Sequence, residues 1–290
     1  MFSGAIVAIV TPFKDGIFDE KAYKRLIEHV IAGGVSGIVP CGTTGESATM
    51  SHAEHERIID MSVSEVGRRV KVIAGTGSNS TDEAISLTKH AKKAGADGIL
   101  SVVPYYNKPT PKGIFAHFEA IAKSCDIPVV LYNIPSRTGI NMSAATTIAL
   151  SKIDTIVGIK EASGDLTIAS QIIKHAHGDF SVLAGDDALT LPMLSIGAKG
   201  VISVTANILP DKISGMIKAW ESGNTAKATE MHLDLIDFHN AMFIETNPIP
   251  VKTALFMMGF LQEEFKLPMC KMDIANKEKL AMALKEKGCI

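Results

Sequence analysis

The sequence has little net charge and no run of basic residues. Its 290 residues include 29 Lys and Arg and 31 Asp and Glu, which give a formal net charge of −2 at pH 7. Proteins that bind nucleic acid or an acidic membrane surface usually carry a basic patch. We therefore expect neither partner, and a small molecule becomes the expected ligand. The hydrophobic fraction of 46% also excludes a disordered chain.

Cysteine is scarce as well. The four cysteines, Cys41, Cys125, Cys270 and Cys289, are widely spaced, and no C-x-x-C pair occurs. This pattern excludes a zinc ribbon and a dense disulfide framework. A reducing cytoplasm is therefore the expected location of the protein.

Long hydrophobic runs are missing. Glycine, proline and serine interrupt the apolar stretches Val30–Cys41 and Ala188–Ala198 well before the roughly 20 residues that a membrane helix needs. Residues Met1–Thr11 are apolar, but no basic residue occurs before Lys14, so we expect a first strand there and not a signal peptide. The sequence therefore predicts no membrane span.

Motifs for nucleotides and metals are incomplete or absent. Gly75-Thr76-Gly77 is a lone G-x-G, and no phosphate-binding G-x-x-x-x-G-K-[ST] loop occurs. His52 and His55 have helical spacing, but the H-E-x-x-H motif of zinc proteases is missing. We therefore expect neither a nucleotide site nor a metal site.

Short runs of β-branched residues recur along the chain, each followed by a turn and a helical pattern. They are apolar throughout, as strands covered on both faces are, and they begin roughly 20 to 35 residues apart, the length of one βα unit. We expect eight strands, at Ala5–Val10, Gly37–Val39, Val70–Ala74, Gly98–Val103, Pro128–Tyr132, Thr155–Lys160, Ser181–Leu183 and Gly200–Val204. Eight such units match a (β/α)8 barrel better than a doubly wound sheet.

The strand pattern ends after about Gly223. Beyond it, the residues predict helices at Thr225–Asn240, Pro250–Glu263 and Ile274–Lys287. The predicted fold class is therefore α/β, with a (β/α)8 TIM barrel as catalytic domain over residues 1–223 and a small helical extension over residues 224–290. We expect the extension to cover the flank of the barrel or an oligomer contact.

Active sites of such barrels lie at the C-terminal ends of the strands and in the loops that follow. Polar residues gather at four of these places, namely Gly42–Ser47, Tyr105–Asn107, Tyr132–Arg137 and Lys160–Glu161. The first three segments carry hydroxyl groups, and the fourth carries an amine. These segments hold the candidate catalytic residues.

Lys160 ends an apolar strand. Desolvation in such surroundings lowers the pKa of an amine, and a neutral amine can attack a ketone. Tyr132, which ends the neighbouring strand, suits a phenol that relays protons, with Thr43 as a partner. The plainer alternatives are a solvated lysine at a strand end and an ordinary core tyrosine.

Two further groups suit a carboxylate. Arg137, in a Pro-Ser-Arg-Thr-Gly loop, is placed to hold one through two parallel hydrogen bonds, although it could be an ordinary loop arginine. The backbone and hydroxyl donors of Thr43 and Thr44, which lie between Gly42 and Gly45, can converge on a small anion.

Taken together, these segments resemble the pyruvate-dependent class I aldolase family that includes N-acetylneuraminate lyase. The resemblance spans essentially the whole chain and is carried by Gly37–Ser47, Val103–Pro109, Tyr132–Pro135 and Gly158–Glu161. The branch that it favours condenses pyruvate with L-aspartate 4-semialdehyde to 4-hydroxy-tetrahydrodipicolinate, a step of lysine and diaminopimelate biosynthesis. The resemblance implies that this reaction needs no metal and no organic cofactor.

The resemblance also implies roles for individual residues. Lys160 would form a Schiff base with pyruvate, and Tyr132 would relay protons. Thr43 would link Tyr132 to Tyr106, which in this family reaches in from a neighbouring subunit of a homotetramer built as a dimer of dimers. The donors of Thr43 and Thr44 would hold the carboxylate of pyruvate.

Three more positions match the substrate-binding residues of the family. Gly185 and Ile202 would offer backbone carbonyl groups near the site. Arg137 would receive the carboxylate of the semialdehyde. Sialate and sugar-acid lyases generally lack an arginine at that position, because their second substrate presents hydroxyl groups.

Two alternative functions remain open. A lyase or aldolase for N-acetylneuraminate or a 2-keto-3-deoxy sugar acid would use the same Lys160 imine, and Arg137 argues against it. A catalytically silent barrel could sense a small carboxylate, although Lys160 and Tyr132 are intact. A flavin or phosphate site is disfavoured because Asp186 and Asp187 lie where a phosphate needs donors.

A second set of polar residues resembles the L-lysine site that sensitive members of the family build between two subunits. Its members are Ser47, Ala48, His52, His55, Asn79, Glu83 and Tyr105. Glu83 and Asn79 suit the α-ammonium group of lysine, Tyr105 suits its carboxylate, and neutral His55 suits its distal ammonium group. We therefore expect feedback inhibition by L-lysine; the alternative is an ordinary polar helix face.

Overall fold

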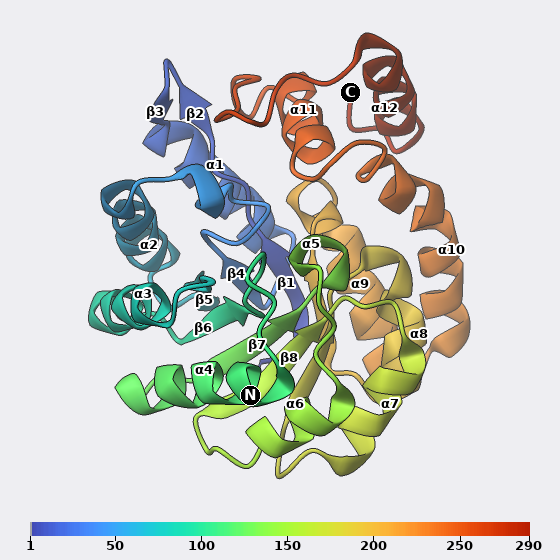
Figure 1. Ribbon diagram of the computed structural model, residues 1–290. Helices are drawn as coiled ribbons and strands as arrows, with labels where there is room; N and C mark the ends of the chain where they lie inside the picture. The colour runs from blue at the N-terminus through green and yellow to red at the C-terminus, as the bar shows by residue number, and fades with distance from the viewer. Residues whose placement is uncertain (1) are drawn as a thin grey trace.

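Eight parallel strands close into a barrel at the centre of the computed structural model, which describes residues 2–290 (Figure 1). Around the barrel, the strands follow the order β1, β10, β9, β8, β7, β6, β5 and β4. Their bounds are Gly4–Ala8 for β1, Gly37–Val39 for β4, Lys71–Gly75 for β5, Gly98–Val102 for β6, Val129–Asn133 for β7, Ile156–Glu161 for β8, Ser181–Ala184 for β9 and Gly200–Ser203 for β10. The predicted (β/α)8 barrel and its eight strands are confirmed. Of the segment Met1–Thr11, predicted to hold the first strand, Met1 lies outside the described residues.

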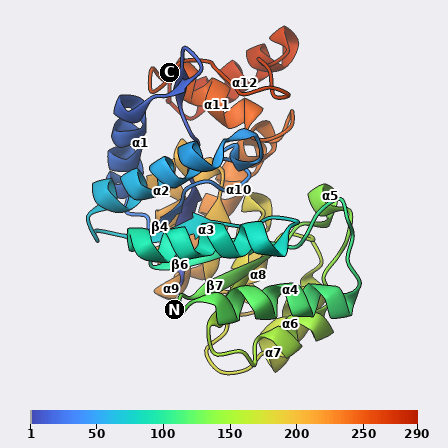
Figure 2. The ribbon, with the colours of Figure 1, turned by 60° about the vertical axis from the view of Figure 1, so that its left-hand side comes forward.

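Helices form the outer layer, and Figures 1 and 2 show α2, α3 and α4 packed in succession around the outside. Side-chain caps define several helix starts; Ser80, for example, accepts a hydrogen bond from the Glu83 backbone N–H at the start of α3. The bounds are Glu20–Ala32 for α1, His52–Val66 for α2, Thr81–Ala94 for α3, Pro111–Ser124 for α4, Pro135–Thr138 for α5, Ala144–Leu150 for α6, Leu166–His175 for α7, Thr190–Ser195 for α8 and Pro210–Glu221 for α9.

Alternate residues of each strand face opposite sides of the barrel wall. Ile6, Val39 and Leu100 belong to the cluster inside the barrel, whereas Val7 and Leu131 belong to the larger cluster between the strands and the helices. Side chains therefore fill the barrel interior, and the last inward-facing residues of the strands line its C-terminal mouth.

A small antiparallel hairpin precedes α1, and the sequence pattern did not predict it. Strands β2, Phe13–Lys14, and β3, Ile17–Phe18, are joined by Asp15 and Gly16, which have φ angles of 55° and 76°. Asp-Gly is a favoured hairpin turn because both residues tolerate positive φ. The Glu264 carboxylate accepts hydrogen bonds from the Asp15 and Gly16 backbone N–H groups at 2.9 and 2.5 Å, which ties the hairpin to the C-terminal part of the chain.

Three helices follow residue 224, namely α10 at Thr225–Ala241, α11 at Ile249–Met257 and α12 at Ile274–Glu286. The predicted helix Pro250–Glu263 is too long, because the chain leaves the helix at Met258 and Gly259 has a φ of 77°. The other two predicted helices are confirmed to within a residue or so. Within residues 2–290, no helix has the length and apolar character needed to cross a membrane.

Candidate active site

The register between β7 and β8 brings Tyr132 and Lys160 together. Tyr132 lies opposite Lys160 in the sheet, and Lys160 lies opposite Leu183 of β9, so these three side chains share the inward face. The Lys160 Nζ atom is 4.6 Å from the centroid of the Tyr132 ring. Each of these two side chains is only 5% exposed. The barrel therefore places an amine and a phenol next to each other in its buried interior.

Burial lowers the pKa of Lys160 from 10.5 to about 8. The negative charge of Asp187 opposes this shift, the positive charge of Arg137 adds to it, and Asp186 opposes it more weakly. About half of the Lys160 amine is consequently neutral at pH 8. A neutral amine is the form that can attack a carbonyl carbon.

Burial has the opposite effect on the phenol, because it raises the pKa of Tyr132 from 10.0 to about 12. Arg137 and a hydrogen bond with the Thr43 side chain lower that pKa in part. Tyr132 therefore keeps its proton at neutral pH and can donate it, as a proton relay requires. That Thr43 relays protons with Tyr132 stays a prediction.

The loop that carries Thr43 and Thr44 is a succession of tight turns. Gly45 N–H donates to the Gly42 carbonyl at 3.0 Å and Glu46 N–H to the Thr43 carbonyl at 3.1 Å. Glu46 has a φ of 60°, a left-handed conformation that costs a non-glycine residue about 1–2 kcal/mol. The side-chain contacts of Glu46 offset this cost.

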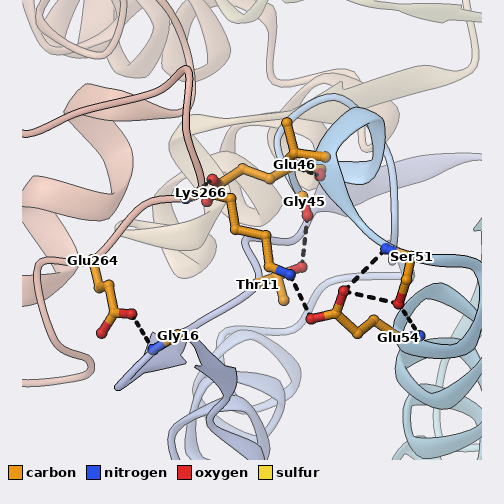
Figure 3. A network of polar contacts seen from close by, with 9 residues as sticks. Thr11, Gly16, Gly45, Glu46, Ser51, Glu54, Glu264 and Lys266 are labelled. Carbon is orange, nitrogen blue, oxygen red and sulfur yellow. Dashed lines mark hydrogen bonds and ion pairs between the residues drawn. The ribbon is translucent and has the colours of Figure 1, made fainter.

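Glu46 anchors the loop to the C-terminal extension. Its buried carboxylate pairs with the Lys252 ammonium group of α11, which is 0% exposed, and it accepts a hydrogen bond from the Lys266 backbone N–H at 2.9 Å. Figure 3 shows that the Lys266 backbone lies beside Glu46, while the Lys266 side chain extends to the Glu54 carboxylate at the start of α2. Thr11, which follows β1, holds the same loop, because its hydroxyl donates to the Gly45 carbonyl at 2.8 Å.

Aromatic rings complete the surroundings of Lys252. Its Nζ atom lies 4.6 Å from the centroid of the Phe13 ring and 4.9 Å from that of Phe265. Burial lowers the pKa of Lys252, and the charge of Glu46 opposes this effect. Removing one partner of such a buried pair typically costs about 3–5 kcal/mol, because the remaining charge has no compensation.

Asn247, which sequence reasoning missed, joins two of the predicted carboxylate binders. Its side-chain amide donates to the Thr44 hydroxyl oxygen at 3.0 Å, and its backbone carbonyl accepts from the Arg137 guanidinium at 2.9 Å. Thr44, Arg137 and Asn247 come from three distant parts of the chain. No local pattern in the sequence points to Asn247, because its partners lie far away along the chain.

Gly185 and Ile202 lie on the β9 and β10 side of the barrel mouth. Gly185 N–H donates to the Glu161 carbonyl at 2.8 Å, and a Cβ atom at position 185 would lie 2.5 Å from the Ala162 side chain, so only glycine fits. Ile202 is buried in the interior cluster. That their carbonyl groups contact a substrate stays a prediction.

Tyr106 does not join Thr43 and Tyr132 within one chain. It lies in the loop after β6, its side chain is 90% exposed, and its φ angle is 71°. A tyrosine held out into solvent in this way does not belong to the buried group around Lys160. The predicted role of Tyr106 in a neighbouring subunit stays a prediction.

A cavity of about 360 Å³ adjoins the barrel mouth. Its wall includes Thr43, Arg137 and Asn247. It also includes six of the seven residues predicted to bind L-lysine, namely Ser47, Ala48, His52, His55, Glu83 and Tyr105. The seventh, Asn79, holds the Tyr105 loop, because its side-chain amide donates to the Tyr105 carbonyl at 3.2 Å. Thr43 and Arg137 of the predicted active site thus share this cavity with most of the predicted lysine-binding residues, whereas Lys160 and Tyr132 do not line it.

Two ionisable side chains in this cavity, His55 and Glu83, have lowered pKa values. Burial lowers the pKa of His55 to about 4, so its ring is neutral at pH 7. Hydrogen bonds from Ser78 and from His52, the latter at 2.7 Å, lower the pKa of Glu83. Glu83 is therefore an ionised carboxylate that already has two partners.

The chain matches the Dihydrodipicolinate synthetase family over residues 1–287. It is 54% identical to the 4-hydroxy-tetrahydrodipicolinate synthase of Syntrophus aciditrophicus (strain SB), with 100% of both chains covered. The crystal structure of dihydrodipicolinate synthase from Aquifex aeolicus superposes with a TM-score of 0.98 at 48% identity and covers 99% of both chains. The enzyme from Cyanidioschyzon merolae with lysine bound superposes with a TM-score of 0.97 at 43% identity, covering 100% of this chain and 99% of that one.

The lowered pKa of Lys160 predicts unusual reactivity toward small electrophiles. Carbamylation of Lys160 by cyanate, followed by peptide mass spectrometry, should rise with pH to a midpoint near 8, because only the neutral amine reacts. The exposed lysines of the same chain provide the reference profile in the same digest.

Arg137 provides the matched control for this measurement. Arg137→Ala should move the Lys160 midpoint to higher pH, because it removes a positive charge that lowers the pKa, whereas Arg137→Lys keeps the charge and the midpoint. A Lys160 midpoint indistinguishable from that of the exposed lysines contradicts the assignment.

Proposed function

The chain belongs to the dihydrodipicolinate synthetase family, and from this premise we propose that it condenses pyruvate with L-aspartate 4-semialdehyde to give 4-hydroxy-tetrahydrodipicolinate. The proposed activity is that of a lyase that works through a Schiff base on Lys160, in lysine and diaminopimelate biosynthesis. One observation carries the proposal: a buried amine, with its pKa lowered to about 8, lies 4.6 Å from the ring of a protonated tyrosine.

The first half of the proposed reaction activates pyruvate. The donors of Thr43 and Thr44 hold its carboxylate, and the neutral Lys160 amine attacks its keto carbon. Tyr132 supplies the proton with which the carbinolamine oxygen leaves as water. The resulting imine loses a methyl proton and becomes an enamine, whose methylene carbon is nucleophilic.

The second half forms the ring. The enamine carbon adds to the aldehyde carbon of the semialdehyde, whose carboxylate lies on Arg137. The amine of the semialdehyde then displaces Lys160 from the imine carbon, which closes the ring and frees the enzyme. One water molecule leaves in the whole sequence, and ring closure is intramolecular because both reactants are by then joined on Lys160.

We further propose that the site is completed by a second copy of the chain. The exposed Tyr106 would extend the contact of Thr43 and Tyr132 in a neighbouring subunit of a homotetramer built as a dimer of dimers. The 90% exposure of Tyr106 supports this role, since an aromatic ring held in solvent is a typical contact residue. We propose a cytoplasmic location, in keeping with a biosynthetic enzyme.

The nearest rival function is cleavage or synthesis of N-acetylneuraminate or a 2-keto-3-deoxy sugar acid. It would use the same Lys160 imine. The position of Arg137 disfavours it, because a guanidinium fixed by the Asn247 carbonyl at the cavity wall suits a second carboxylate and not a sugar hydroxyl. A silent carboxylate sensor would have no need of a reactive amine.

An assay of pyruvate consumption with different aldehydes tests the proposal. Pyruvate should be consumed with L-aspartate 4-semialdehyde but not with N-acetylmannosamine or glyceraldehyde. Arg137→Ala should lower kcat/KM for the semialdehyde about 10- to 100-fold, because it removes a hydrogen bond between charged groups that is worth about 1.5–3 kcal/mol, while the KM for pyruvate changes far less. Turnover with a sugar aldehyde alone supports the rival lyase, and turnover with none supports the sensor.

We also propose that L-lysine inhibits the enzyme from the cavity that contains His55 and Glu83. The relative from Cyanidioschyzon merolae has been solved with lysine bound. Neutral His55 can accept a hydrogen bond from the distal ammonium group of lysine, and its Nδ1 atom has no partner within residues 2–290. The cavity adjoins Arg137, so an occupant can influence the active site.

Titration of L-lysine to millimolar concentrations in the same assay should reduce the rate. His55→Lys should abolish the inhibition, because its ammonium group repels that of the ligand, and His55→Gln, which stays neutral, should weaken it less. His175→Lys, at an exposed position of α7 outside the cavity, is the matched control and should leave inhibition intact. Full inhibition of His55→Lys refutes the proposed lysine site.

A further inference from the structure

Asn247 has an unusual position at the cavity wall. It precedes α11, is only 5% exposed, and lines the cavity beside Arg137 and Thr43. Two of its polar groups have partners: the side-chain amide nitrogen donates to Thr44, and the backbone carbonyl accepts from Arg137. The side-chain oxygen, Oδ1, is buried and has no hydrogen-bond partner within residues 2–290.

The hydrogen bond to Thr44 decides what the Thr44 hydroxyl can do. A hydroxyl group has one proton to donate. Because Asn247 donates to the Thr44 oxygen, the Thr44 proton stays available for a ligand, such as the carboxylate of pyruvate. The same orientation of the amide leaves Oδ1 as an acceptor without a donor, and a buried acceptor of this kind is unfavourable until a donor binds it.

The neighbouring Arg137 indicates which donor fits. The guanidinium contacts the backbone of Asn247 itself, at 2.9 Å, so a carboxylate on Arg137 lies next to Asn247. An α-amino acid carries its amine on the carbon that bears the carboxylate. A ligand held through that carboxylate therefore brings N–H donors to the immediate surroundings of the unpartnered Oδ1.

We propose that Asn247 is a specificity-determining residue whose side-chain oxygen accepts a hydrogen bond from the α-amine of the second substrate. The proposal rests on the proposed function, since it assumes that this substrate is an α-amino acid with an aldehyde group. The hydrogen bond selects aminated over deaminated semialdehydes. It also holds in place the amine that later displaces Lys160.

A comparison of two semialdehydes isolates this hydrogen bond. The quantity to measure is the ratio between the inhibition constant of 4-oxobutanoate, which lacks the amine, and the KM of L-aspartate 4-semialdehyde. Asn247→Ala removes the acceptor and should lower this ratio about 10- to 100-fold, the value of one hydrogen bond to a charged group. The KM for pyruvate should change by no more than about threefold, because the Thr44 proton stays available.

Two variants complete the experiment. Asn247→Asp keeps an acceptor and should therefore retain the wild-type ratio. Its carboxylate competes with both semialdehydes for Arg137, but an equal loss of affinity for both leaves the ratio unchanged. Asn240→Ala, on the exposed face of α10, controls for the substitution itself and should leave every constant unchanged.

The outcomes separate this inference from the proposed function. A wild-type ratio in Asn247→Ala, or a ratio lowered equally in Asn247→Ala and Asn247→Asp, overturns the role of Oδ1 while the reaction stands. A wild-type enzyme that does not turn over L-aspartate 4-semialdehyde overturns the proposed function itself.

Discussion

Strand β8 pairs with β7 so that Lys160 lies opposite Tyr132, and the chemistry of the barrel depends on this register. A shift of one residue would turn Lys160 to the outer face of the sheet. In the observed register, the apolar interior removes water from the amine and the phenol alike. The same burial lowers the pKa of Lys160 and raises that of Tyr132, so that the amine loses its proton more easily and the phenol keeps its own.

The C-terminal extension supplies parts of the site and does more than cover the flank of the barrel. Lys252 holds Glu46, and with it the loop of Thr43 and Thr44, through an ion pair that is closed off from water. Such a pair gains little stability over an apolar contact, but it tolerates few other arrangements of its partners. Asn247, from the same extension, fixes Thr44 and Arg137 relative to one another.

The sequence predicted the parts of the molecule that repeat or that form chemical patterns along the chain. Apolar runs at βα spacing identified the eight strands, and polar residues at strand ends identified Lys160 and Tyr132. The helix predicted at Pro250–Glu263 was too long because its apolar pattern continues past Gly259. Partners such as Asn247 and Thr44, 203 positions apart, leave no local signal, because only the closed barrel brings them together. The assigned catalytic roles stay predictions.

Trapping of the imine tests the central claim most directly. The protein is incubated with pyruvate and borohydride, digested, and its peptides are weighed. Reduction of an imine on Lys160 should add one carboxyethyl group to the peptide that contains this residue, and Lys160→Ala should give no adduct. An adduct on another lysine, or none on the wild-type protein, would contradict the account.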